Sequence, residues 1–203
     1  MREHAMNLAT SVSFSEVPAL PVVVPLGLAL FTVLLWRLRA TRRFTAPRAA
    51  VAAALSVYAA GVIANTVFPI FLDKPDTGVP WTPHIALIPF ADYEVSDALM
   101  NMAVFLPLGM LIPLLLSRPT WAKVIAIAAA ASLGIEASQL AAQGMFDGGH
   151  IADINDFLSN VIGGALGYGL LWLLTRSPRL SRFVEHFRWT PSAGQAVAAS
   201  EPR

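Results

Sequence analysis

Residues 132–167 read SLGIEASQLAAQGMFDGGHIADINDFLSNVIGGALG. The stretch joins two apolar runs through a short segment of glycine and polar residues, and it places Glu136, Gln139, Asp156 and Asn160 inside or beside those runs. Polar side chains at the depth of a membrane are costly, so they require either partners or a function. If both runs are membrane helices, these polar residues lie within the membrane, and the first question about the fold is whether the runs cross it.

The composition is that of an integral membrane protein. Of the 203 residues, 56% are apolar and only 13% are charged, against roughly 25% charged residues in a typical soluble domain, and the mean hydropathy is +0.60. The chain has no cysteine, which excludes disulfides and thiolate metal sites and leaves the redox compartment open.

Five apolar runs are long enough, or nearly so, to cross the roughly 30 Å of bilayer hydrocarbon as helices. They are residues 17–36, 49–71, 98–116, 121–142 and 157–175. The first run is too long for the core of a signal peptide and has no basic segment before it, so we expect it to remain as a membrane helix. The sequence thus predicts an all-α polytopic membrane protein with five transmembrane helices.

The basic residues predict how these helices are oriented. Five arginines lie in residues 37–48, Arg118 and Lys123 lie between the third and fourth runs, and four arginines lie in residues 176–188. Five spans place all three basic segments on one side, and loops rich in Lys and Arg face the cytoplasm. We therefore expect the N-terminus outside and the C-terminus in the cytoplasm.

With this topology, polar side chains from four helices fall in one outer layer of the membrane. The residues concerned are Asn65, Thr66, Asn101, Ser132, Glu136, Gln139, Gln143, Asp156 and Asn160. Those of the fourth helix share one face, because they follow helical spacing. The inner halves of the same helices are nearly all apolar, so we expect one polar cluster open to the outside.

A plainer alternative exists for most of these residues. Asn, Gln and Ser in membrane helices often only bond a neighbouring helix, for about 0.6 kcal/mol each. Asp97, Asp147 and Asp153 can be loop acids or helix N-caps. Glu136 differs, because an acid in the hydrocarbon layer costs roughly 2.5–3.5 kcal/mol. We expect Glu136 to be neutral or paired with a cation such as His150, and to have a functional role.

Several of these residues also carry a family resemblance. The pattern NxxxFxPLG begins at Asn101, ExxQ at Glu136 and DxxDxxxNxxG at Asp153, and LIPF occupies residues 87–90. In this order the patterns resemble the VanZ-like family, over roughly residues 49–174. The resemblance implies a small helical protein of the bacterial cytoplasmic membrane, in a family whose namesake is linked to low-level resistance to the glycopeptide teicoplanin. It implies no established chemistry.

Two positions depart from the family pattern. Family members usually have Arg at the position of His150, and many have Asn at the position of Ala86. A titratable cation replaces a permanent one. A family function that needs this Arg to bind an anion therefore does not follow for this chain from the resemblance alone. The same applies to teicoplanin resistance.

The predicted organisation has three parts. Residues 1–48 hold the first transmembrane helix and a basic cytoplasmic loop, residues 49–176 form a VanZ-like four-helix membrane domain, and residues 177–203 form a basic amphipathic segment and a disordered tail. Within the last part, we expect residues 179–189 to form a short helix that lies on the inner membrane surface, attracted by anionic lipid.

The predicted function is the binding of a lipid-linked cell-wall precursor or a glycopeptide at the outer polar cluster, without a cofactor or metal. The ligand-binding residues are Asn101, Glu136, Gln139, His150, Asp153, Asp156 and Asn160. Nucleic-acid binding is not expected, because the arginines are confined to loops and lack interleaved aromatic residues.

Two alternatives remain open. The first is a membrane enzyme acting on a lipid or polyprenyl substrate, with Glu136, His150, Asp153 and Asp156 as an acid/base pair or as ligands of a divalent metal. The second is a small proton-coupled transporter with Glu136 as its proton site.

Overall fold

The computed structural model describes residues 15–68, 70–71, 85–90, 94–146 and 152–190, and the regular secondary structure in these residues is helical apart from two pairs of two-residue strands. The helices are α1 (Leu20–Ala40), α2 (Ala46–Val67), α3 (Val95–Leu115), α4 (Trp121–Phe146), α5 (Ile154–Leu174) and α6 (Pro178–Glu185). Five of them, α1 to α5, are long and apolar enough to cross a membrane. The chain is therefore a multi-pass membrane protein of all-α class, as predicted.

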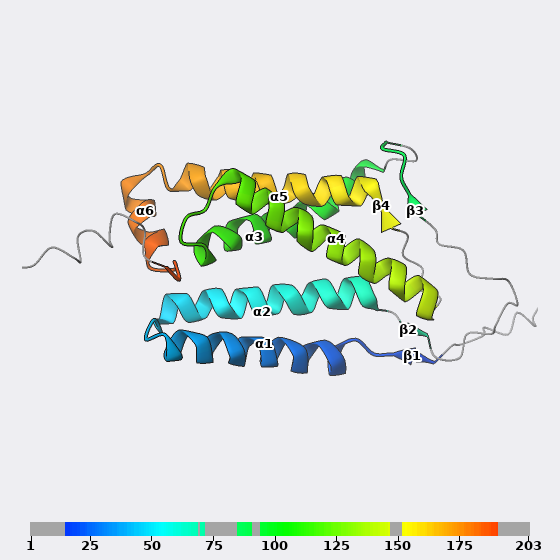
Figure 1. The fold of residues 1–203 in the computed structure, drawn as a ribbon, viewed down its shortest axis with the longest axis horizontal. Coiled ribbons are helices and arrows are strands. Elements are labelled where there is room, and N and C mark those ends of the chain that lie inside the picture. Colours follow the sequence, from blue (N-terminus) through cyan, green and yellow to red (C-terminus); the bar gives the residue numbers. More distant parts are fainter. Residues whose placement is uncertain (1–14, 69, 72–84, 91–93, 147–151, 191–203) are drawn as a thin grey trace, which may run out of the picture.

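The helices form two groups (Figure 1). Helices α1 and α2 lie side by side as an antiparallel hairpin, and α3, α4 and α5 form a second group above it. Helix α6 lies at the end of the molecule where α1 connects to α2, and the four strands lie at the opposite end. We call these the α6 end and the strand end.

The strands tie segments together at the strand end. Strand β1 (Glu16–Val17) pairs antiparallel with β2 (Ile70–Phe71), which joins the start of α1 to the residues after α2. Strand β3 (Ile85–Ala86) pairs in parallel with β4 (Ala152–Asp153), which places Ala86 opposite Asp153. The residues before α3 are thereby held against the start of α5.

Helix ends differ from the predicted ends by a few residues, because local caps decide them. Helix α2 begins at Ala46, since the Thr45 side chain accepts a hydrogen bond from the Arg48 N–H and Pro47 fits a first helical turn. Helix α5 begins at Ile154, since Asp153 accepts a hydrogen bond from the Asn155 N–H. Asp153 is thus a helix N-cap, and Asp156 lies within the first turn of α5.

Helices α3 and α5 approach most closely, and glycines make this approach possible. A Cβ atom added to Gly163 would overlap the backbone of Met102, and one added to Gly167 would overlap the carbonyl of Leu106. Gly109 of α3 faces Gly164 of α5 in the same way. Small residues at such positions let helix backbones pack in direct contact within a membrane.

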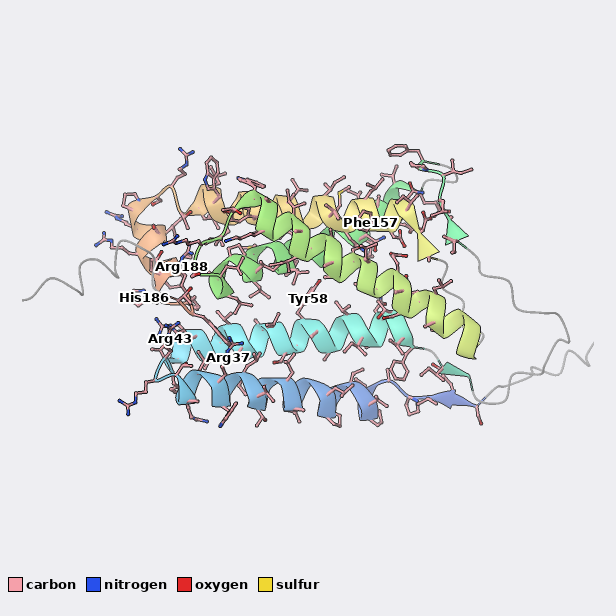
Figure 2. All side chains as sticks on the ribbon, in the orientation of Figure 1. Arg37, Arg43, Tyr58, Phe157, His186 and Arg188 are labelled. Atoms are coloured by element: carbon pink, nitrogen blue, oxygen red, sulfur yellow. The ribbon has the colours of Figure 1, made fainter. Side chains whose placement is uncertain are left out.

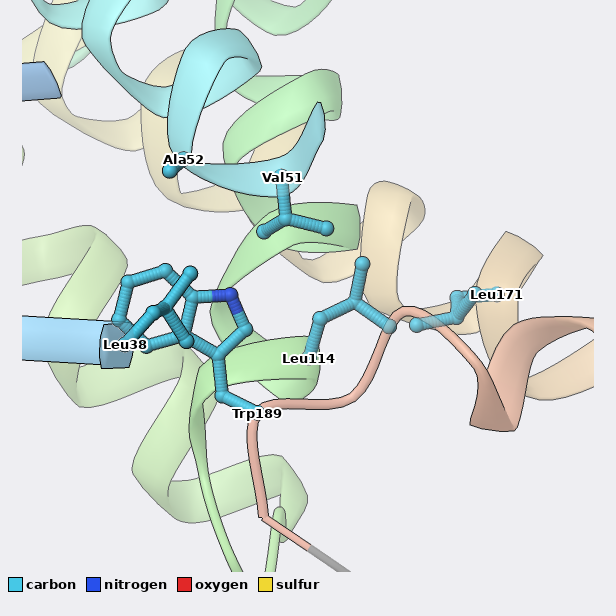
Figure 3. Close-up of a cluster of buried hydrophobic side chains, with 6 residues drawn as sticks. All are labelled: Leu38, Val51, Ala52, Leu114, Leu171 and Trp189. Carbon is cyan, nitrogen blue, oxygen red and sulfur yellow. The ribbon is translucent and has the colours of Figure 1, made fainter. Parts of the chain in front are cut away.

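The α6 end contains a core that the sequence did not predict. Residues 179–189 were expected to lie on the membrane surface, but α6 ends at Glu185 and the chain turns inward to bury Trp189. Figure 3 shows the buried cluster, which consists of Leu38, Val51, Ala52, Leu114, Leu171 and Trp189. The segment after α6 therefore connects the α1–α2 hairpin to α3 and α5.

Hydrogen bonds fix this turn from residues distant in sequence. The Trp189 N–H donates to the Leu114 carbonyl at 2.8 Å. Arg48 donates to the Arg188 carbonyl at 2.7 Å, and Arg43 donates to the Trp189 carbonyl at 3.2 Å. Arg43, from the connection between α1 and α2, and Arg48, from the first turn of α2, thus bind the backbone that follows α6.

Candidate functional site

A cavity of about 510 Å³ lies between α2 and the group formed by α3, α4 and α5. Its apolar lining includes Val57, Met100, Val104, Phe105 and Ile135. Its polar lining residues are Asn65, Thr66, Asn101, Glu136, Gln139, Asp156 and Asn160. Five residues of the predicted ligand site, from three helices, therefore line one cavity.

The cavity is polar toward the strand end and apolar toward the α6 end. Asn65 and Thr66 lie in the last turn of α2, and Asn101 and Asp156 lie in the first two turns of α3 and α5, all near the strands. Val57 and Phe105 lie one or more turns deeper in their helices. Beyond them the α6 half of the α3–α4–α5 group is filled by apolar side chains such as Ile112 and Val124.

Glu136 is tied to the start of α5. Its Oε2 accepts a hydrogen bond of 2.9 Å from the Asp153 backbone N–H, at the N-terminus of α5. A carboxylate is favoured there, because the unpaired N–H groups of a helix start carry partial positive charge. Its other oxygen, Oε1, is buried and has no hydrogen-bond partner among the described residues.

Asn101 and Asp156 join α3 to α5 inside the cavity. The Asn101 Nδ2 donates to the Asp156 Oδ1 at 2.6 Å. This bond holds the Asp156 carboxylate on the cavity wall. It also explains why both polar residues are found in apolar helices that pack closely together.

Asn160 and Ser132 fit the plainer interpretation of polar residues in membrane helices. The Asn160 Nδ2 donates to the Ser132 Oγ at 3.0 Å, and both side chains are buried. The bond connects α5 to α4 and uses the Ser132 oxygen as the acceptor. Asn160 also lines the cavity, so it contributes both to helix packing and to the cavity wall.

Two further cavity residues carry buried polar atoms without a partner in the described part of the chain, the Gln139 Oε1 and the Tyr58 hydroxyl. Tyr58 lies on the side of α2 that faces the α3–α4–α5 group (Figure 2). Buried polar atoms are nearly always bonded, so these atoms are open to a partner from outside the protein, either water or a bound molecule.

The sequence prediction missed Tyr58. A single tyrosine in the middle of an apolar run was the only available signal, and tyrosine in a membrane protein is more often found at the headgroup level. Its placement on the cavity side depends on the rotation of α2, which the sequence alone does not determine.

Two residues of the predicted ligand site, Asp153 and His150, are not among the described residues that line this cavity. Asp153 caps α5 and lines a smaller neighbouring cavity of about 40 Å³, together with Glu94, Asp97 and Asp156. His150 lies outside the described residues. Among the residues that are described, no three acidic or histidine side chains are grouped so that they could hold a metal ion.

The described walls of the two cavities are acidic. Glu136 and Asp156 line the larger one, Glu94, Asp97 and Asp153 the smaller one, and no Lys or Arg belongs to either set of described lining residues. The buried unpaired atoms of Glu136 and Gln139 are oxygens. The described walls therefore offer acceptor oxygens and acidic groups, an arrangement that is unfavourable for an anion.

The family model for VanZ/LLP1 matches residues 55–175. The chain belongs to the VanZ/LLP1 family. The matched region of this VanZ/LLP1 protein runs from within α2 to the end of α5, and it includes the cavity residues of all four helices. No curated protein and no solved structure matched the chain.

The LIPF segment of this VanZ/LLP1 protein is bound to the start of α5 through Asn155, a residue that lines the smaller cavity. The Phe90 N–H donates to the Asn155 Oδ1 at 2.8 Å, and Phe90 adopts a left-handed backbone conformation with a φ of 63°. Ala86, one of the two departures from the family pattern, pairs with Asp153, whose N–H binds Glu136. The segment is thus linked through the start of α5 to the polar end of the larger cavity.

Proposed function

We propose that this VanZ/LLP1 protein is a multi-pass protein of the bacterial cytoplasmic membrane that binds a lipid-linked or glycopeptide ligand in an outward-facing cavity. A link to teicoplanin resistance is part of the proposal. The observation that carries it is the single cavity lined by Asn101, Glu136, Gln139, Asp156 and Asn160, with unpaired acceptor oxygens in its wall.

The charge distribution supports the outward orientation. Arg37, Arg43, His186 and Arg188 lie at or near the α6 end (Figure 2), as do the other arginines of the α1–α2 connection. Basic residues flanking membrane helices favour the cytoplasmic side. With the α6 end in the cytoplasm, the polar part of the cavity faces the outer surface, where cell-wall precursors and glycopeptides are found.

The chemistry of the wall supports a particular mode of binding. A carboxylate that accepts hydrogen bonds from a ligand contributes about 1.5–3 kcal/mol per bond, because the acceptor is charged. Sugar hydroxyls, peptide amides and amines all provide such donors. A phosphate does not, so the phosphate of a lipid-linked precursor is expected to lie outside the acidic wall.

The test is direct binding to the purified protein in lipid nanodiscs, with teicoplanin and a lipid-linked peptidoglycan precursor as the two ligands. We expect Glu136→Gln to weaken binding of the true ligand about tenfold or more, since the loss of one charged hydrogen bond has about that effect. Ser138→Ala is the matched control, because Ser138 lies on α4, is exposed and bonds only its own helix.

The proposal would be contradicted if the wild-type protein bound neither of the two ligands and a deletion strain kept the same glycopeptide susceptibility. Conversion of a bound lipid into a product by the wild-type protein, abolished by Glu136→Gln, would favour the enzyme alternative. The transporter alternative has less support, because apolar side chains such as Phe105, Leu108 and Val124 fill the described helices between the cavity and the α6 end.

A further inference from the structure

A second cavity of about 420 Å³ lies between α1 and α2 and is almost entirely apolar. Leu20, Val24, Leu28 and Phe31 line it from α1, and alanines line it from α2. Ser56 is its one polar lining residue, and the Ser56 hydroxyl donates to the Ala52 carbonyl of its own helix at 2.8 Å. The described wall therefore offers nothing to a polar ligand and suits a hydrocarbon chain.

This apolar cavity adjoins the polar cavity over one edge of α2. Val57 and Gly61 line both of them. The Val57 side chain is 73% exposed, and a Cβ atom added to Gly61 would meet nothing within 4 Å. Few atoms therefore separate the two cavities at Val57 and Gly61, and a flexible hydrocarbon chain can pass over α2 at this edge.

The positions along α2 place the polar groups and the apolar cavity in a fixed order. Along α2 the two cavities overlap from Val57 to Ala64, but the polar residues Asn65 and Thr66 lie at the strand end, and only the apolar cavity continues past Val57 to Ala53. The order is that of a lipid in one leaflet, with its head group near the surface and its chain pointing toward the middle of the bilayer.

From this order we infer that the α1–α2 cavity holds one hydrocarbon chain of the ligand whose head group occupies the polar cavity. The inference rests on the proposed function and narrows the ligand to an amphiphile, with hydroxyl, amide or amine donors in its head. The chain leaves the head group near Asn65, crosses α2 at Gly61 and lies between α1 and α2. The hydrocarbon belongs either to an acyl chain or to a polyprenyl chain.

The two glycines Gly61 and Gly134 give a matched pair of variants. Both lie inside membrane helices, and for both an added Cβ atom meets nothing within 4 Å. Gly61 lies on the edge between the cavities, whereas Gly134 lines neither of them. We expect a phenylalanine at Gly61 to extend into the edge between the cavities and block the passage, whereas one at Gly134 lies outside both cavities.

The experiment uses full-length protein in nanodiscs with two photoreactive probes, a palmitoyl glucoside and a polyprenyl glucoside, each with a diazirine in its chain. Phosphatidylcholine with the same diazirine reports on bulk lipid. We expect one glucoside to label residues 20–31 and 53–64 more strongly than phosphatidylcholine does, and which one does so identifies the chain. Gly61→Phe is expected to lower this labelling about tenfold, and Gly134→Phe is expected to leave it unchanged.

Equal labelling by the glucosides and phosphatidylcholine would mean that bulk lipid fills the cavity, and it would overturn the inference. Labelling that persists in Gly61→Phe would overturn it as well. In either case, weaker teicoplanin or precursor binding by Glu136→Gln would show that the proposed function still holds. If Glu136→Gln also had no effect on either ligand, the proposed function would fail separately.

Discussion

Glu136 has two oxygens with different environments, and the difference explains how an acid is placed in an apolar helix. One oxygen accepts the Asp153 N–H, so the carboxylate is held by the start of α5. The other is buried in the cavity wall without a partner among the described residues. The first bond fixes the side chain, and the second oxygen remains available to a ligand.

Tyr58 offers the complementary chemistry, a buried donor deeper in the cavity. We expect Tyr58→Phe to leave the free energy of unfolding unchanged or to raise it slightly, because removing an unpaired buried polar group costs little or nothing. If the hydroxyl donates to the ligand, the same variant weakens binding roughly threefold to tenfold. Thermal unfolding in detergent and ligand titration measure the two effects.

Tyr168→Phe is the control for this prediction. The Tyr168 hydroxyl donates to the Pro119 carbonyl at 3.4 Å, and its ring packs against Trp121 away from the cavity. Loss of this weak bond should lower stability by about 1 kcal/mol or less and should not change ligand binding. A Tyr58→Phe variant that is strongly destabilised would show that its hydroxyl has a structural partner.

The residues of the cavity were partly predictable from the sequence. Glu136, Asn101 and Asp156 could be placed in one layer, because the order of the spans and the 1.5 Å rise per residue fix the depth of each side chain. Which partner each would bind was not predictable, since it depends on how the helices rotate and pack. The partner of Glu136 is the backbone N–H of Asp153, the N-cap of α5. The predicted helix began only at residue 157, so this cap was not placed by the sequence.

At the scale of elements, α3 and α5 behave as one unit because their backbones are in contact. We expect Gly167→Ala to lower the free energy of unfolding by about 1–3 kcal/mol or more, since the added methyl group meets a backbone carbonyl that has no room to move. Thermal unfolding of the purified variant in detergent checks this.

Gly134→Ala is the comparison for this change. The added methyl group meets open space, and alanine favours a helix by about 1 kcal/mol over glycine, so stability should be equal or higher. Equal unfolding temperatures for Gly167→Ala and the wild-type protein would mean that α3 and α5 lie further apart than described.

The helices themselves were predicted well, since length and hydropathy determine a membrane span with little help from the rest of the chain. Most of the surface segment predicted at residues 179–189 forms helix α6, which has no buried residue, but its end was predicted wrongly, because Trp189 is buried. Its alternation of basic and apolar residues fits an interfacial helix, and nothing local indicates that Trp189 is buried. Arg43 and Arg48 hold the buried end in place, because they bind the backbone of Trp189 and Arg188 from 146 and 140 residues away in sequence.

At the scale of the whole molecule, the proposed orientation can be tested with single cysteines, because the chain has none of its own. Glu16 and Arg179 are exposed at opposite ends of the structure. We expect Glu16→Cys to react with a membrane-impermeant maleimide in spheroplasts and Arg179→Cys to react only after permeabilisation. The reverse pattern would place the polar end of the cavity in the cytoplasm and would exclude an extracellular ligand.

The burial of Trp189 also constrains how the molecule can move. The α6 end of the hairpin is fastened to α3 and α5 through Trp189 and two arginines, whereas α2 touches α3 and α4 over far fewer residues than α3 touches α5. The α1–α2 hairpin is therefore held most firmly at the α6 end, which acts as the pivot for any tilt of the hairpin. At the strand end only sparse contacts of α2 and β2 with α4 oppose an opening, so we expect any tilt of the hairpin to widen that end of the cavity first and to let it accept ligands of different sizes.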